Sequence, residues 1–64
     1  MLLNGRKVEL DRSTSLPEIL EQAGLEKSRV AVLHNGRIVP RVQLDRTEIA
    51  DSDVLEVVSF VGGG

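Results

Sequence analysis

Apolar and polar residues alternate on both sides of two Asn-Gly pairs, Asn4-Gly5 and Asn35-Gly36. Asn-Gly readily adopts the positive φ angles of a type I′ turn, and alternation with a period of two is typical of a strand with one buried face. The sequence therefore predicts two β-hairpins, over residues 1–10 and 30–39. In the first hairpin, four apolar side chains share the buried side: Met1, Leu3, Val8 and Leu10.

The second hairpin carries aliphatic side chains on both faces. With Asn35-Gly36 as the loop, Leu33 opposes Ile38 and Val32 opposes Val39. This is more apolar surface than a strand pair covered on one side can bury, so part of it is a candidate docking surface. Pro40 cannot donate a backbone hydrogen bond, and we expect it to end the strand.

Between the hairpins, apolar residues recur at the spacing of a helix. Ser15 and Glu18 have the separation of a capping box, and Pro17 is tolerated in a first helical turn. Gly24 is typical of a left-handed cap at the end of a helix. The sequence predicts one short helix whose apolar stripe packs in the core: Leu16, Ile19, Leu20 and Ala23.

Residues 41–53 are polar and only weakly periodic. We expect Val42, Leu44 and Ile49 to point inward from an otherwise exposed loop. Asp51-Ser52-Asp53 is typical of a turn, because such side chains bond back to nearby backbone groups.

Residues 54–58 are rich in β-branched side chains and predict a last strand that leads into Ser59 and Phe60. If Leu55 and Val57 face the core, strand parity places Glu56 and Val58 in solvent. Val58 and Phe60 would then form an apolar surface for a partner, which Leu33 and Ile38 could extend. The alternative is that Phe60 folds back and completes the small core.

The chain continues from Phe60 into Val61, Gly62, Gly63 and Gly64. Glycine has no Cβ, so a glycine run can lie extended in a narrow active site of another protein. The carboxylate of Gly64 is therefore a candidate reactive group, and residues 61–63 are candidate partner contacts. The alternative is a frayed end without a function.

Composition narrows the classes of function. At 64 residues the chain is expected to form one domain, with no cysteine for a disulfide or thiolate metal site and with His34 as its single histidine. His34 precedes a turn and fits a rim position better than a catalytic one. A net charge of −2 and a single aromatic residue argue against nucleic acid as a partner. No stretch has the length of a membrane span, so a cytoplasmic protein is the expectation.

The order hairpin, helix, hairpin, polar loop and strand is typical of an α+β protein in which one helix packs on a mixed sheet. If the last strand pairs in parallel with the first, the fold is a ubiquitin-like β-grasp with a four- to five-stranded sheet. Residues 1–60 would form this domain, and residues 61–64 would form a flexible C-terminal tail.

Several segments together resemble the ThiS-type sulfur carriers of thiamine thiazole synthesis: Leu2-Leu3-Asn4-Gly5, Asn35-Gly36-Arg37-Ile38-Val39-Pro40-Arg41, the turn at 51–53 and Val61-Gly62-Gly63-Gly64. The resemblance covers nearly the whole chain. Two positions depart from the usual pattern of the family, since Ser52 stands where glycine is common and Leu44 where an aromatic residue is frequent.

The resemblance implies that an E1-like adenylyltransferase of the ThiF type joins the carboxylate of Gly64 to AMP, using ATP and Mg²⁺ that belong to that enzyme. A sulfur-donor protein would then provide persulfide sulfur, and the thiocarboxylate would pass sulfur to a thiazole synthase of the ThiG type. The chain would be a co-substrate, not an enzyme, with no cofactor or metal of its own.

Other functions stay open at this point, because terminal glycines also occur in other ubiquitin-like proteins. The chain would then be a sulfur carrier of the molybdopterin-synthase type or a modifier that is joined to lysine. A third possibility is a β-grasp interaction module that does not use its tail.

Overall fold

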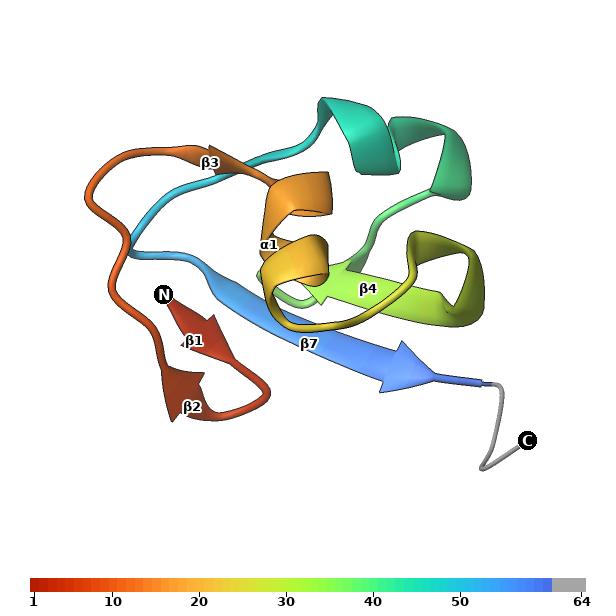
Figure 1. Ribbon diagram of the computed structural model, residues 1–64, viewed down its shortest axis with the longest axis horizontal. Helices are drawn as coiled ribbons and strands as arrows, with labels where there is room; N and C mark the ends of the chain where they lie inside the picture. Colours follow the sequence, from red (N-terminus) through yellow and green to blue (C-terminus); the bar gives the residue numbers. More distant parts are fainter. Residues whose placement is uncertain (61–64) are drawn as a thin grey trace.

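The last strand of the protein lies at the centre of a mixed, five-stranded sheet (Figure 1). The computed structural model describes residues 1–60, so the predictions for Val61, Gly62, Gly63 and Gly64 fall outside the described residues. The strand order is β2-β1-β7-β4-β5. The strands comprise β1 Leu2–Leu3, β2 Arg6–Lys7, β4 Val30–His34, β5 Arg37–Ile38 and β7 Val54–Ser59.

Strand β7 pairs in parallel with β1 and antiparallel with β4. Leu2 is in register with Val54 on one side, and Val32 is in register with Val57 on the other. The first and last strands are therefore neighbours, as the β-grasp prediction requires, and the mixed sheet on one main helix confirms that fold class.

Both predicted hairpins form around left-handed asparagines, with φ of 52° at Asn4 and at Asn35. Leu3 pairs with Arg6 in the first hairpin and Leu33 with Ile38 in the second, which confirms both registers. Val8 lies opposite Met1 as predicted, and the two residues exchange backbone hydrogen bonds at 2.8 and 2.9 Å. Val8 is nevertheless 36% exposed and Met1 only 5%, because the segment of Val8 continues the edge strand β2.

Helix α1 (Leu16–Gln22) begins at the predicted cap, where the Ser15 hydroxyl accepts a hydrogen bond from the backbone N–H of Glu18 at 3.4 Å. The side chain of Glu18 does not complete the capping box; it accepts from Gln22 Nε2. The helix also ends earlier than the apolar pattern predicts. Ala23 is its C-cap and lies exposed, not in the core.

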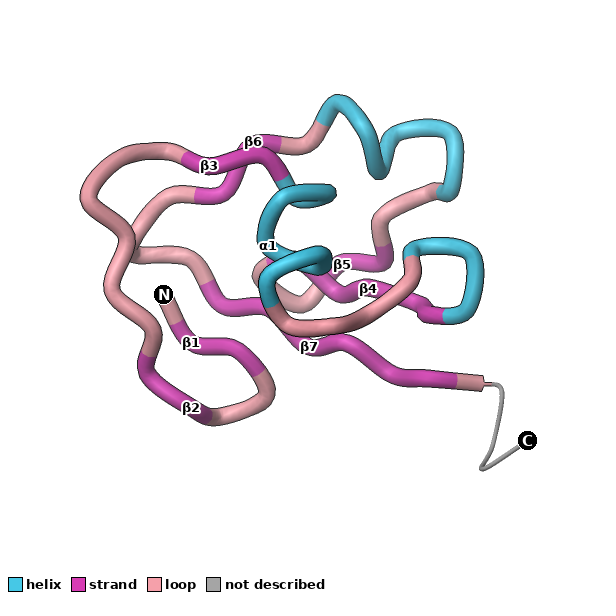
Figure 2. Tube along the Cα trace, in the orientation of Figure 1, coloured by secondary structure: helices cyan, strands magenta, loops and turns pink. Residues whose placement is uncertain are grey.

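The polar segment after Pro40 contains structure that the sequence does not predict. A 3₁₀ helix, η2 (Arg41–Arg46), is followed by strand β6 (Glu48–Ile49), which pairs with β3 (Thr14–Ser15) in a second small sheet (Figure 2). A further 3₁₀ turn, η1 (Lys27–Arg29), precedes β4.

Leu44 and Ile49 point inward as predicted, and the prediction for Val42 is wrong. With three residues per turn of a 3₁₀ helix, Val42 cannot share the inward face with Leu44. Leu44 is 3% exposed and Val42 is 82% exposed.

The turn at 51–53 forms as predicted, with the N–H of Asp53 donating to the carbonyl of Ala50 at 3.0 Å. Within residues 1–60, Asn4 and Asn35 are the only non-glycine residues with positive φ. Serine therefore fits at position 52 without backbone strain.

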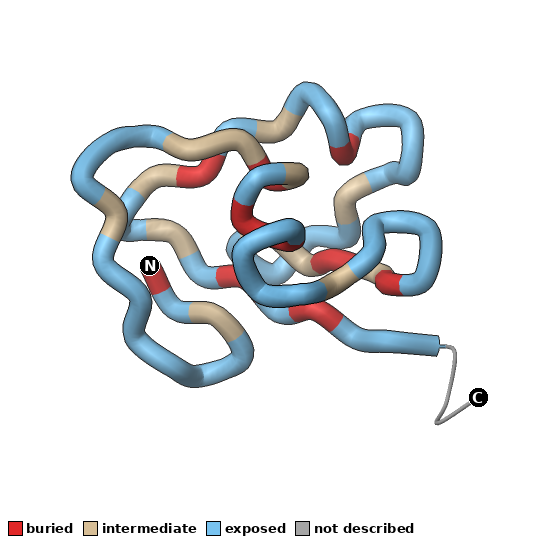
Figure 3. Tube along the Cα trace, viewed as in Figure 1, coloured by how far each residue is buried: buried red, intermediate tan, exposed pale blue. Residues whose placement is uncertain are grey.

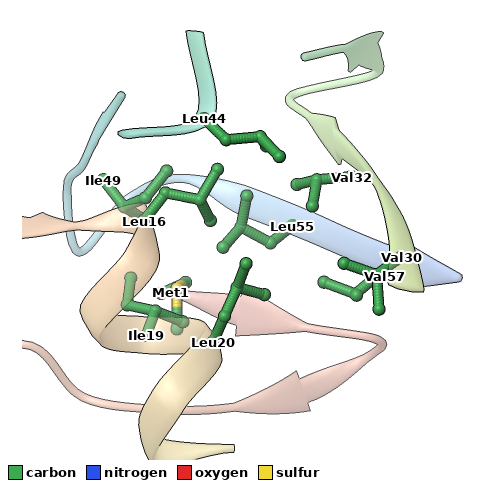
Figure 4. Packing of buried hydrophobic residues seen from close by; sticks show 10 residues of the cluster. All are labelled: Met1, Leu16, Ile19, Leu20, Val30, Val32, Leu44, Ile49, Leu55 and Val57. Atoms are coloured by element: carbon green, nitrogen blue, oxygen red, sulfur yellow. The ribbon is translucent and has the colours of Figure 1, made fainter. Parts of the chain in front are cut away.

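The core lies between α1 and the sheet (Figures 3 and 4). Leu16 and Leu20 of the helix and Leu55 of β7 are among its most deeply buried side chains. The full set is Met1, Leu16, Ile19, Leu20, Val30, Val32, Leu44, Ile49, Leu55 and Val57. In the part of the chain that the structure describes, no helix has the length and apolarity to cross a membrane.

Candidate functional site

The candidate functional site lies at the C-terminal end of β7, where the chain leaves the sheet (Figure 1). The backbone N–H of Phe60 still donates to the carbonyl of Arg29 at 3.2 Å, so the antiparallel pairing with β4 continues to this residue. The ring of Phe60 does not fold back into the core, and the residue is 56% exposed.

Arg41 comes from the start of η2 and reaches this end of the sheet. Its guanidinium carbon lies 5.9 Å from the centre of the Phe60 ring. Nη1 donates to the carbonyl of Lys27 at 2.8 Å, and Nη2 donates to the carbonyl of Val30 at 3.5 Å. Arg41 therefore joins three separate segments, η2, η1 and β4.

The face of the sheet opposite the helix is largely apolar. Strand parity turns Leu55 and Val57 toward α1 and places Val54, Glu56 and Val58 on the other side, as predicted. The neighbouring strands add side chains in register with these positions. We call this surface the outer sheet face and define it by Leu2, Ala31, Leu33, Ile38, Val54 and Val58.

Four members of the outer sheet face are exposed: Ile38 by 68%, Val58 by 53%, Leu2 by 41% and Val54 by 39%. The strand that contributes Val58 leads directly to Phe60, which we call the tail base because residues 61–64 follow it. The apolar surface and the tail base therefore belong to one segment. Leu2 was not predicted as a member, because its place depends on the register between β1 and β7. Such grouped exposed aliphatic residues are typical of a protein interaction site.

His34 lies at the opposite end of β7 from Phe60, next to the turn that precedes the strand. Its Nε2 is 2.8 Å from Oδ2 of Asp53. The six residues of β7 span roughly 20 Å, so this pair is remote from the tail base. The arrangement fits the predicted rim position.

The Asp53 carboxylate organises that end of the sheet. It accepts from the backbone N–H of Ala50 at 2.8 Å and from Asn35 Nδ2 at 3.2 Å, besides its contact with His34. The Ala50 hydrogen bond, followed by the His34 contact, holds the pKa of Asp53 below its usual value. Asp53 is therefore a structural carboxylate that favours the ionised form in the folded protein.

The fold and the site together define a class: a small ubiquitin-like β-grasp protein with an apolar sheet face beside its last strand. The family model described as ThiS family matches residues 1–64. The chain is 36% identical over 63 residues to the sulfur carrier protein ThiS of Bacillus subtilis, covering 97% of this chain and 96% of that protein. It is 39% identical over 62 residues to ThiS of Thermus thermophilus, covering 97% and 95%.

The chain belongs to the ThiS family. The crystal structure of a thiamine biosynthesis protein (ThiS) from Geobacter metallireducens matches with a TM-score of 0.81 at 30% identity, covering 98% of this chain and 96% of that one. These likenesses confirm the resemblance to a ThiS-type sulfur carrier of thiamine biosynthesis. A thiazole synthase of Paramagnetospirillum magneticum is 33% identical over 64 residues, and the chain spans 20% of that protein.

Replacement of Asp53 by Asn should reduce stability in a pH-dependent way. Folding lowers the pKa of Asp53 from its usual 3.8, so its contribution is present above that pH and is lost as the pH falls through the lowered pKa. We expect Asp53→Asn to lower the free energy of unfolding at pH 7 by about 1–3 kcal/mol, with the difference narrowing in acid. Urea unfolding at a series of pH values measures this.

The matched control is Asp45→Asn, which removes a carboxylate from an exposed ion pair with Lys27 at 2.6 Å. Such surface pairs contribute about 0–1 kcal/mol. Equal losses from both variants at pH 7, or a difference for Asp53→Asn that does not change in acid, would contradict the role assigned to Asp53.

Proposed function

We propose that the carboxylate of Gly64 is the group that carries sulfur, and that it is activated by an E1-like adenylyltransferase of the ThiF type in the cytoplasm. The observation that supports this most directly is the path of β7. The strand is held between two neighbours and ends at Ser59, and the chain then continues through the exposed Phe60 toward the three glycines of the sequence. Membership of the ThiS family supports the same assignment.

The chemistry of a carboxylate explains why an activating enzyme is needed. An α-carboxyl group has a pKa of about 3.5, so it is ionised at neutral pH and resists attack by a nucleophile. Adenylation at its oxygen releases pyrophosphate from ATP and installs AMP as a leaving group. Mg²⁺ and ATP are bound by the activating enzyme, and the carrier is its co-substrate.

Sulfur enters in the next step. The terminal sulfur of a persulfide on a sulfur-donor protein attacks the acyl carbon, and AMP leaves with the carboxylate oxygen. A thiol then reduces the resulting acyl disulfide and releases the thiocarboxylate. The carrier has no cysteine of its own, so the sulfur that it holds would be on Gly64.

A thiazole synthase of the ThiG type is the proposed acceptor of this sulfur. Two proteins named thiazole synthase, from Paramagnetospirillum magneticum and Magnetococcus marinus, contain a segment similar to this chain, which covers 20% and 19% of their lengths. Joining two partners in one chain raises their effective concentration. This supports a functional partnership between the carrier and the synthase.

The outer sheet face is the proposed docking surface for the activating enzyme. Val58 and Phe60 lie on the segment that leads to Val61, Gly62 and Gly63, so an enzyme that binds the tail is brought against them. Apolar contact there would provide affinity, and the slender glycines would enter the active site of the enzyme.

Deletion of Gly64 should abolish activation and leave the fold unchanged, because the core is built from residues up to Val57. The wild-type protein and the truncated variant would be incubated with the activating enzyme, ATP and a persulfide donor. Their masses would then be measured by intact-protein mass spectrometry. The wild type should gain the mass difference between sulfur and oxygen, and the variant should gain nothing while melting at the same temperature.

Adducts with other proteins in the same experiment would support a lysine modifier instead. Sulfur transfer to a molybdopterin-synthase partner in place of thiazole synthase would support the other carrier type. Full activation of the protein lacking Gly64 would contradict the proposal.

Replacement of Val58 by Ser tests the docking surface. The side chain is 53% exposed, so we expect little change in stability but about tenfold weaker binding of the activating enzyme. Titration calorimetry with the enzyme measures the affinity. Val42→Ser is the matched control, since Val42 is an 82% exposed valine outside the outer sheet face. Equal affinities for the Val58→Ser variant and the wild type would remove Val58 from the interface.

A further inference from the structure

Arg41 links the end of β7 to two other segments of the fold. Its two terminal nitrogens bond the carbonyls of Lys27 in η1 and Val30 in β4, while the guanidinium lies over the ring of Phe60. We propose that Arg41 is a positioning residue that orients Phe60 and thereby sets the direction in which the chain leaves the sheet toward the tail. This inference rests on the proposed function of the tail.

Phe60 needs such a contact because the core does not hold its ring. The backbone N–H of Phe60 is bonded to Arg29, but the residue is 56% exposed. At this end of the sheet the buried positions are occupied by Val30 of β4 and Val57 of β7. Val30 pairs with Ser59, and Val57 pairs with Val32. A cation over the aromatic face is thus an interaction that favours one orientation of an otherwise exposed ring.

The geometry requires arginine. A guanidinium group is planar, so it can donate from its edge to two carbonyls while its face lies against an aromatic ring. The ammonium group of lysine is a compact point charge and cannot provide this combination. An ion pair between Lys27 and Asp45 at 2.6 Å is a second link between η1 and η2, the two segments that Arg41 also joins.

The consequence for activation is a change in the population of the conformation that the enzyme binds. If only a fraction of the carrier directs its tail correctly, the apparent affinity falls by that fraction, while the reaction of the bound carrier is unaffected. An exposed cation–π contact corresponds to about a two- to fivefold change in that population. Loss of the contact should therefore raise KM by this factor and leave kcat unchanged.

The test compares Arg41→Ala, Phe60→Leu and the double variant with the wild type. KM and kcat for the carrier are measured by adenylation with the activating enzyme, and ¹⁵N relaxation gives the order parameter of the Phe60 amide. Each single variant should raise KM about two- to fivefold, and Arg41→Ala should lower the order parameter. In the Phe60→Leu background, Arg41→Ala should have no further effect on KM.

Arg46→Ala is the matched control, because it removes the same charge from the other end of η2. It should change neither KM nor the order parameter. Arg41→Lys should raise KM almost as much as Arg41→Ala, since lysine keeps the charge without the two directed hydrogen bonds. If Arg41→Ala fails to fold, the order parameter of the residue 60 amide in Phe60→Leu still tests the contact, because this variant leaves the hydrogen bonds of Arg41 in place and the order parameter is measured without the enzyme.

Two results would overturn the inference. The first is an unchanged KM and order parameter in Arg41→Ala. The second is an equal rise in KM with and without the Phe60 ring, which would mean that Arg41 contacts the enzyme directly. If the wild type forms no adenylate at all, the proposed function fails, and the order parameter alone then decides whether Arg41 orients Phe60.

Discussion

The parallel pairing of β1 with β7 is the interaction on which the rest of the structure depends. It places the last strand in the middle of the sheet, between β1 and β4. The strand β1 has only two residues, Leu2 and Leu3, and the side chain of Asn4 continues its ladder. Asn4 Oδ1 accepts from the N–H of Val57 at 2.7 Å, and Nδ2 donates to the carbonyl of the same residue at 3.3 Å.

Asn4 therefore has two structural roles. Its backbone adopts the positive φ that a tight turn requires, and its side-chain amide replaces the peptide group of a longer strand. At the start of β7, Asn35 has the same two roles, and its Oδ1 accepts from the N–H of Val54 at 2.8 Å. The two Asn-Gly turns therefore hold the same strand from opposite sides, at Val57 and at Val54.

This construction explains how so small a domain can hold firmly the strand that leads to its C-terminal glycines. Leu55 and Val57 fix β7 to the helix, and the two flanking strands fix it within the sheet. Beyond Val57 the residues of the strand are exposed, and Phe60 is held at the rim by Arg29 and Arg41. Structural residues and candidate binding residues thus occupy opposite faces of a single strand.

Much of this could be predicted from the sequence, because the signals are local. Asn-Gly turns define hairpin registers, and the alternation from Val54 to Val58 defines the two faces of β7. The pairing of Thr14–Ser15 with Glu48–Ile49 could not be predicted, since two-residue strands have no measurable period. The place of Val42 depends on a 3₁₀ turn without a sequence signature, and the contact of Arg41 with Phe60 depends on the tertiary fold.

Native-state hydrogen exchange tests the central claim, that β7 is the most firmly held part of the molecule up to the base of the tail. The amides of Leu55 and Val57 should exchange only through global unfolding, with a free energy equal to that from urea denaturation. The amide of Phe60, at the rim, should exchange with a smaller free energy. Exchange of Leu55 and Val57 through local opening, well below the free energy of global unfolding, would contradict the account.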